Sequence, residues 1–171
     1  EVNRLFKSLE QQTYKDFEIV IVSQVNHDEI NKLIDKWKEL KIKHIEIDKK
    51  GISLSRNIGL SECSGEWVIL SDDDCWYPSD ALEIINKRII DSDADIILSQ
   101  IYDPKNKKTY KNYSSKIKII KSKYELMSKS SIEIAIKNNK INQEFDTNFG
   151  LGAKYECGEE VDFLLAHFKK C

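Results

Sequence analysis

The chain has 171 residues, of which 33% are charged and 40% hydrophobic, and its formal net charge at pH 7 is −2. This length suffices for one domain with a buried core, and the near-neutral charge argues against a protein that binds nucleic acid through a general basic field. The four cysteines show no Cys-x-x-Cys spacing and the histidines are scattered, which argues against a disulfide scaffold and a structural zinc site.

Apolar periodicity predicts helices and strands in alternation over the first part of the chain. In order, it predicts a helix over 3–13, a strand over 17–22, a helix from Asp28 to Leu40, a strand over 43–47, a helix over 52–63, a strand over 67–70, a helix over 81–90 capped by Ser79, and a strand over 94–102. Such alternation predicts an α/β fold with a mostly parallel central sheet flanked by helices.

The rest of the chain is less regular. It predicts a hairpin or flexible insertion over 103–123, a short helix over 124–127, a strand over 131–136, a glycine-containing loop over 145–158 and a helix over 159–169. We therefore expect a small antiparallel or loop portion toward the C-terminus. The chain is interpreted as one domain, 1–171, with halves at 1–102 and 103–171.

Eight lysines lie between Asp103 and Glu125 with no acidic residue among them. Such a run is typical of a solvated face or a mobile loop. A sharper hypothesis is an electropositive flap beside an anionic ligand.

The chemically most informative stretch is GEWVILSDDDCWYP, residues 65–78. Its apolar run predicts a buried strand, and three carboxylates follow where open α/β sheets bind their ligands. Because alternate residues of an extended segment point the same way, Asp72 and Asp74 can face one site while Asp73 faces elsewhere. Two hard oxygen donors suit Mg²⁺ or Mn²⁺. The alternative is a solvated acidic turn that caps the next helix.

A second acidic cluster, Glu159, Glu160 and Asp162, follows a loop with three glycines. Carboxylates are favoured at the start of any helix by its dipole, so a structural role would explain them. Together with the first cluster they become candidates for a general base.

Three blocks of the sequence resemble the family 2 glycosyltransferases, which have the GT-A nucleotide-sugar-binding fold. SLEQQTYKDFEIVIV (Ser8–Val22) is similar to the family's first helix and following strand. GISLSRNIGLSECSGEWVILSDDDCWYPSDAL (Gly51–Leu82) contains an Arg-Asn-x-Gly turn and an Asp-x-Asp motif of the family's type. FDTNFGLGAKYECGEE (Phe145–Glu160) resembles its acceptor-side segment.

The resemblance implies an inverting, metal-dependent transfer of a sugar from a nucleotide-diphosphate donor to an acceptor hydroxyl. At the matched positions, Asp74 and Asp72 would hold Mn²⁺ or Mg²⁺, and Asp72 and Asp73 would contact the donor. Arg56 would face the diphosphate or pin its own loop, whereas Trp76 would line the sugar site or pack in the core. Glu160, preceded by Glu159, would be the catalytic base.

The resemblance also implies a UDP- or GDP-linked donor, a saccharide or lipid-linked acceptor, and a role in bacterial surface polysaccharide synthesis. It places the protein in the cytoplasm or at the inner face of the membrane, attached peripherally through parts outside this chain. No apolar stretch of the sequence approaches the length of a membrane span.

The chain departs from the family's pattern in three places. The family's usual first strand and its C-terminal region have no counterpart here, and the turn that commonly contacts the base reads Ser23-Gln24-Val25-Asn26. These departures favour the alternative of a GT-A module that binds nucleotide, glycan or protein without catalysis. A phosphatase with an Asp-x-Asp nucleophile is a more distant rival, because that motif normally lies near the N-terminus.

Overall fold

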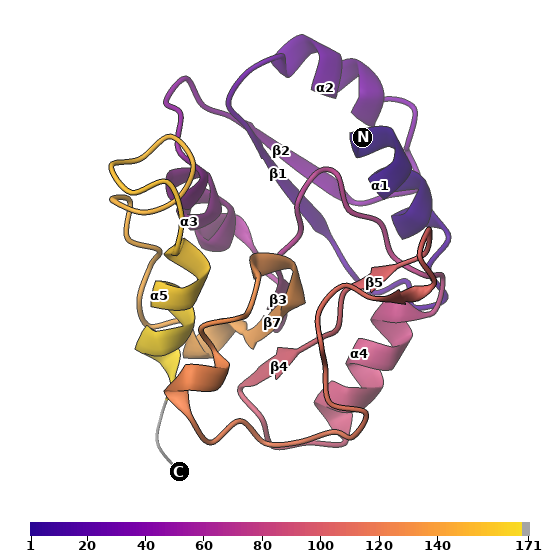
Figure 1. Ribbon diagram of the computed structural model, residues 1–171. Helices are drawn as coiled ribbons and strands as arrows, with labels where there is room; N and C mark the ends of the chain where they lie inside the picture. The colour runs from indigo at the N-terminus through magenta and orange to yellow at the C-terminus, as the bar shows by residue number, and fades with distance from the viewer. Residues whose placement is uncertain (169–171) are drawn as a thin grey trace.

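The structure is a computed structural model that describes residues 1–168. The elements in chain order are α1 (Val2–Glu10), β1 (Ile19–Ser23), α2 (His27–Ile34), β2 (Ile42–Glu46), α3 (Ile52–Glu62), β3 (Trp67–Ile69), α4 (Ala81–Ile90), β4 (Ile96–Leu98), β5 (Tyr102–Asp103), β6 (Lys108–Thr109), the 3₁₀ turns η1 (Lys123–Glu125) and η2 (Ser131–Glu133), β7 (Ile134–Lys137), the 3₁₀ turn η3 (Asn138–Lys140) and α5 (Glu159–His167). The predicted α/β class is confirmed (Figure 1).

The strands form two larger groups and one small hairpin. β1 and β2 pair in parallel, with Ile19 opposite Ile42. β7 lies between β3 and β4 and runs antiparallel to both, so β3 and β4 point the same way. β5 and β6 form the short hairpin. The parallel β-α-β arrangement is thus interrupted by one late antiparallel strand.

β1 and β3 each pair along only one edge within the described residues. The amide of Ile19 and the carbonyl of Ser23 bond toward β2, so the register turns the backbone groups of Val20 and Val22 to the other side. On β3, Leu70 and its alternate neighbours bond toward β7. One strand in each of the two larger groups therefore keeps a free edge.

Two apolar clusters pack on opposite faces of β3, because successive strand residues point to opposite sides. Val68 and Leu70 belong to a cluster with Phe163 and Leu164 of α5, and all four are buried. Ile69 instead packs against Leu5, Leu9 and Leu82, which come from α1 and α4. The sheet around β3 is therefore covered by α5 on one face and by α1 and α4 on the other.

The start of α4 is held by a residue that is remote in the sequence. The amide of Gln12, which is 1% exposed, receives the Leu82 N–H at Oε1 (3.0 Å) and donates through Nε2 to the Pro78 carbonyl (2.7 Å). The helix begins at Ala81 after Asp80, and the side chain of that N-cap residue makes no capping hydrogen bond. The predicted cap at Ser79 is therefore wrong, because Gln12 satisfies the free amide instead.

Several predicted bounds also differ from the observed ones. α2 ends at Ile34, and Trp37 follows in a turn where it packs edge-on against Phe6. The strand predicted over 94–102 is shorter, and the one over 131–136 begins with a 3₁₀ turn. The helix from Glu159 is observed to His167, and its predicted end at Lys169 lies outside the described residues.

Cys63, Cys75 and Cys157 are free thiols. Within residues 1–168, no helix combines the length and apolarity that crossing a membrane requires.

Candidate functional site

The three carboxylates lie in a turn directly after β3. The Leu70 N–H makes the last ladder bond, to the Ile134 carbonyl, and the chain then turns so that the Cys75 N–H meets the Asp72 carbonyl (3.3 Å). The side chain of Asp72 is half-buried, whereas Asp73 and Asp74 are exposed. The strand therefore delivers the acidic turn to the edge of the core, as its sequence predicts.

Arg56 of α3 joins this turn to α5. One guanidinium nitrogen donates to Asp72 Oδ1 at 3.3 Å, and another donates to Glu159 Oε1 at 2.8 Å. The side chains of Arg56 and Glu159 are only 11% and 10% exposed. The two acidic clusters, 87 positions apart between Asp72 and Glu159 in the sequence, thus meet at one arginine.

α5 begins at Glu159, immediately after Gly158, whose φ of 95° is in the left-handed region. A left-handed residue at this position turns the chain sharply into the helix, and glycine adopts it without strain. Glu159, Glu160 and Asp162 all lie in the first turn of α5. The sharp entry brings the first of these carboxylates to Arg56.

The surroundings of Asp72 and Glu160 favour their protonated forms. Burial raises the pKa of Asp72, and Asp74 and Asp73 add to this, while the charge and hydrogen bond of Arg56 oppose it. Burial likewise raises the pKa of Glu160, and the neighbouring Glu159 carboxylate raises it further. A carboxyl group with a raised pKa beside a charge partner is a common feature of catalytic acids and bases.

Arg4 of α1 contacts both Asp74 and Trp76, and no sequence pattern predicted these two contacts. Arg4 donates to the Asp74 carbonyl at 2.6 Å, and its guanidinium lies over the Trp76 ring at 4.0 Å from the centroid. Trp76 is 41% exposed, so it is not part of the core. Its ring therefore lies at the surface beside the acidic turn, with the Arg4 guanidinium over one of its faces.

The loop before α5 is anchored to α3 by two polar side chains. Asn57 receives the Phe145 N–H (2.8 Å) and donates to the Phe145 carbonyl (2.9 Å). Ser53 donates to the Phe149 carbonyl at 2.7 Å. Neither anchor could be inferred as such from the sequence, although Asn57 belongs to the Arg-Asn-x-Gly turn. α3 thus fixes both the arginine and the loop that leads to the candidate base.

Gly150 is the tightest point of this loop, and Gly150→Ala is expected to lower the free energy of unfolding by about 1–3 kcal/mol. Its φ is +96°, and a Cβ there would collide with Ile52 Cγ2 and approach Glu159 Cδ and Ser53 Oγ at 3.2 Å each. Denaturant unfolding measures the effect. Gly59→Ala is the matched control, because its Cβ meets only Val22 at 3.6 Å and alanine favours helix. Equal stability of the two variants would contradict the assigned strain.

The acidic turn offers oxygen donors for a metal but not a complete protein cage. Among residues 1–168, no group of three or more His, Cys, Asp or Glu side chains is placed to hold a metal ion. Arg56 contacts Oδ1 of Asp72, and the other oxygen has no protein partner within these residues. Two carboxylates with water and phosphate oxygens are a donor set that Mg²⁺ and Mn²⁺ accept. The residues present therefore fit such a metal if the substrate completes its shell.

A separate hollow of about 140 Å³ lies between the start of α3 and the loop around Phe149. Lys49, Lys50 and Gly152 are among its lining residues, whereas Asp72 is not. It is smaller than the 300–1,000 Å³ or so of usual small-molecule sites. The cluster of side chains that meet at Arg56 is therefore a stronger candidate for the functional site than this hollow.

Comparison with known proteins gives the fold a precedent. The TarS 1–349 structure from Staphylococcus aureus in complex with UDP superposes with a TM-score of 0.72 at 18% identity, covering 98% of this chain and 51% of that one. The mannosyltransferase PcManGT from Pyrobaculum calidifontis, in complex with GDP-Man and Mn²⁺, gives 0.69 at 15% identity, covering 97% and 47%. At these identities the likeness concerns the fold alone.

The sequence comparisons concern the family. Glycosyltransferase GlyA of Streptococcus pneumoniae is 33% identical over 103 residues, which are 59% of this chain and 15% of that protein. The chain thus spans a small part of this relative. The profile of glycosyl transferase family 2 matches residues 1–155. Because this match covers most of the chain, the chain belongs to glycosyl transferase family 2.

Proposed function

We propose that this chain transfers a sugar, with inversion at the anomeric carbon, from a nucleotide-diphosphate donor to an acceptor hydroxyl. The observation that carries the proposal is the position of Arg56, which contacts Asp72 after β3 and Glu159 at the start of α5. This arrangement supports a site in which the carboxylates after β3 would bind the donor and Glu160, next to Glu159, would act as the base. Residues 1–102 would form the donor half and residues 103–171 the acceptor half.

On the donor side, Asp72 and Asp74 would hold Mn²⁺ or Mg²⁺. When bound, the metal supplies charge neutralisation for the diphosphate that leaves. Asp73 would contact the donor from the exposed side of the turn, and Trp76 would offer its surface ring to the sugar. Arg56 contacts the half-buried Asp72 and opposes the rise in its pKa that burial causes.

On the acceptor side, Glu160 would take the proton from the attacking hydroxyl. The acceptor oxygen then forms a bond to the anomeric carbon while the bond from that carbon to the phosphate oxygen breaks. The nucleoside diphosphate departs with the bonding electron pair, and the proton remains on the Glu160 carboxyl. Glu159 is committed to Arg56, so it serves better as a positioning residue than as the base.

The donor is proposed to be UDP- or GDP-linked, since UDP and GDP-Man occupy the two structural neighbours. The acceptor is a saccharide or a lipid-linked carrier, in bacterial surface polysaccharide synthesis. We place the reaction on the cytoplasmic side of the membrane.

Calorimetric titration with UDP and GDP, each with and without Mn²⁺, tests this proposal. We expect metal-dependent binding of one nucleotide, and Asp74→Ala should weaken it at least about tenfold. Loss of even an outer-shell partner of a metal ligand costs roughly 10- to 100-fold, and a direct ligand should cost no less. Asp93→Ala, which removes an exposed carboxylate elsewhere, is the matched control. Retained Mn²⁺-dependent affinity in Asp74→Ala would refute the metal assignment.

One observation favours the alternative of a GT-A module that binds nucleotide, glycan or protein without catalysis. In the turn after β1, Gln24 Oε1 already accepts the Gly51 N–H at 2.6 Å. The Ser23 hydroxyl lies between His27 Nδ1 (2.5 Å) and His44 Nε2 (2.7 Å). Both side chains are thus engaged within the protein rather than free for a nucleotide base. Absence of binding to either nucleotide in the titration would support this alternative.

A further inference from the structure

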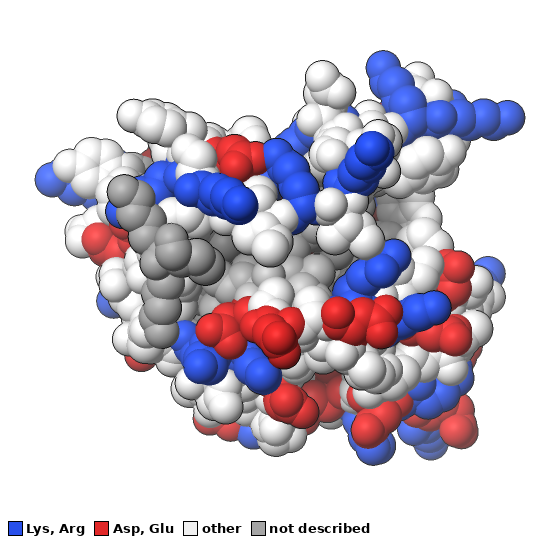
Figure 2. Space-filling view, turned by 90° about the horizontal axis from the view of Figure 1, so that it is seen from below, with Lys and Arg blue, Asp and Glu red and all other residues white. Residues whose placement is uncertain are grey.

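The segment over 103–125 carries a strong local charge. Its eight lysines and two acids give a formal charge of +6, so the other residues of the chain carry −8. Six of the lysines are exposed and make no ion pair within residues 1–168: Lys105, Lys107, Lys108, Lys116, Lys121 and Lys123. Figure 2 shows basic side chains predominating along the upper edge of one face, while most of its acidic side chains lie in the lower half.

The two acids of the segment do not neutralise those six lysines. Asp103 accepts hydrogen bonds from the amides of Lys105 and Asn106 and from the Asn106 side chain, all within its own turn, and these bonds lower its pKa. Glu125 pairs with Lys118, which lowers the pKa of Glu125. The positive charge of the other lysines therefore faces outward.

Large apolar side chains are exposed among these lysines. Ile117 is 77% exposed, Ile119 is 74% exposed and Tyr124 is 87% exposed. The adjacent Ile120 instead packs against the core cluster beneath α5 and β7. The segment thus turns one isoleucine inward as an anchor and leaves its neighbours in water, where they gain nothing from burial.

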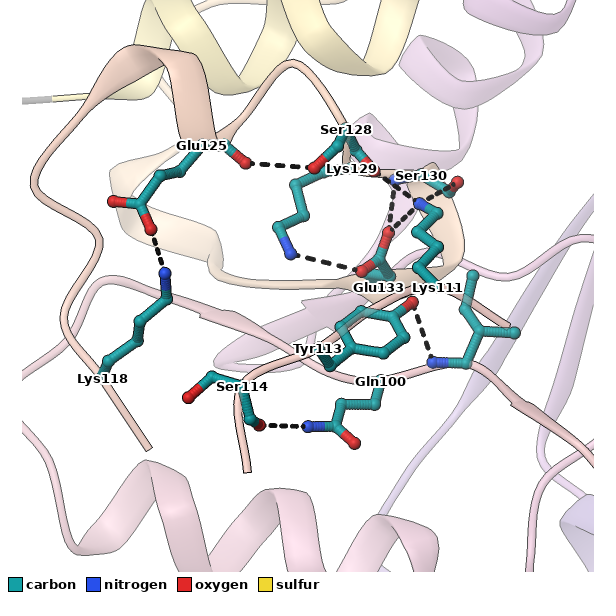
Figure 3. A network of polar contacts seen from close by, with 11 residues as sticks. Gln100, Lys111, Tyr113, Ser114, Lys118, Glu125, Ser128, Lys129, Ser130 and Glu133 are labelled. Carbon is teal, nitrogen blue, oxygen red and sulfur yellow. Dashed lines mark hydrogen bonds and ion pairs between the residues drawn. The ribbon is translucent and has the colours of Figure 1, made fainter. Parts of the chain in front are cut away.

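The buried carboxylate of Glu133 anchors the segment over 103–125 to the rest of the fold (Figure 3). Lys111 pairs with Glu133, whose side chain is 0% exposed, and also donates to the Ser128 carbonyl and Ser130 Oγ at 2.7 Å each. The Tyr113 hydroxyl accepts the Ile101 N–H at 3.2 Å. Because Lys111 and Tyr113 anchor the segment in this way, it presents its lysines and isoleucines as a defined surface.

We propose that this surface, formed by residues 105–124, docks on an anionic lipid bilayer. Lysines near a bilayer are attracted to anionic headgroups, and isoleucine and tyrosine side chains enter the boundary between headgroups and acyl chains. The negative charge of the rest of the chain disfavours other orientations. A single-stranded nucleic acid could stack on the exposed rings of Tyr110 and Tyr124, but it would leave Ile117 and Ile119 without an apolar environment, whereas a bilayer buries all four. This inference does not depend on the proposed transfer reaction.

Co-sedimentation with lipid vesicles tests the inference. We expect the chain to bind phosphatidylcholine vesicles that contain about 30 mol% phosphatidylglycerol, to bind pure phosphatidylcholine far more weakly, and to be released by salt. Each lysine contributes about a fivefold change in affinity at such a surface, so Lys116→Gln/Lys121→Gln should weaken binding about 25-fold. Ile117→Ser/Ile119→Ser should weaken it about tenfold or more while leaving its salt dependence in place.

The matched control is Lys36→Gln/Lys38→Gln, which removes two exposed lysines just after α2 and outside residues 105–124. This variant should bind vesicles as the parent chain does. Equal loss in the control and in Lys116→Gln/Lys121→Gln, or no binding by the parent chain, would overturn the proposal. So would full binding by Ile117→Ser/Ile119→Ser, because it would indicate a site for soluble polyanions instead. Circular dichroism checks that each variant is folded.

Discussion

Replacement of Glu160 by glutamine is expected to leave nucleotide binding unchanged and to lower the rate of sugar transfer about 10²- to 10⁴-fold. Glutamine has nearly the shape of glutamate but cannot take the proton from the acceptor hydroxyl, and general-base catalysis is worth about that factor. The rate is measured as release of UDP or GDP from the nucleotide-sugar in the presence of saccharide acceptors. Calorimetry with the same nucleotide measures binding.

Asp162→Asn is the matched control for Glu160→Gln, since it makes the same kind of change in the same helical turn. We expect it to retain transfer. Full transfer by Glu160→Gln would instead move the base to Glu159 or Asp162. Because burial raises the pKa of Glu160 above its ordinary 4.5, the proposed transfer by the parent chain should slow as the pH falls through a value above 4.5. Glu160→Gln should lack this acidic limb.

Replacement of Arg56 by methionine is expected to lower the free energy of unfolding by about 3–5 kcal/mol. Glu159 is 8% exposed and would keep a buried charge without its partner, which is the costly outcome when one member of a buried pair is removed. Asp72 would lose the same partner at the end of β3. Denaturant unfolding with a constant slope measures the change.

Two further variants distinguish this cause from a general packing defect. Arg56→Met/Glu159→Leu removes both charges and should regain most of the lost stability, because apolar groups of similar volume replace buried ion pairs at little cost. Arg4→Met removes an arginine whose bond to the Asp74 carbonyl lies at the surface, and it should cost about 1 kcal/mol or less. A double variant no more stable than Arg56→Met would contradict the buried-charge explanation.

Local patterns predicted the elements that carry the candidate site. The apolar run before Asp72 identified β3, and the periodic residues after Gly51 identified α3. These signals succeed because strand alternation, helix spacing and polar punctuation are properties of neighbouring residues. Tertiary contacts then decide the ends of the elements. The early end of α2, for example, accompanies the packing of Trp37 on Phe6.

Long-range partnerships could not be predicted in this way. The amide of Gln12 caps α4 from 70 positions away, and Arg4 reaches the carbonyl of Asp74. Placement of β7 between β3 and β4 likewise follows from its pairing and not from its own sequence. The link from Arg56 to Glu159 spans 103 positions. A sequence names the groups capable of such contacts, but only the folded chain selects among them.

The free edges of β1 and β3 imply alternating hydrogen-exchange protection along both strands. The amides of Val20 and Val22, and those of Trp67 and Ile69, face away from the paired neighbours and have no acceptor within residues 1–168. They should take up deuterium faster than the amides between them. Strands with such unpaired groups are templates for a further strand. Each of these two groups of strands could therefore gain a further strand without breaking an existing ladder bond, leaving the acidic turn and α5 in place.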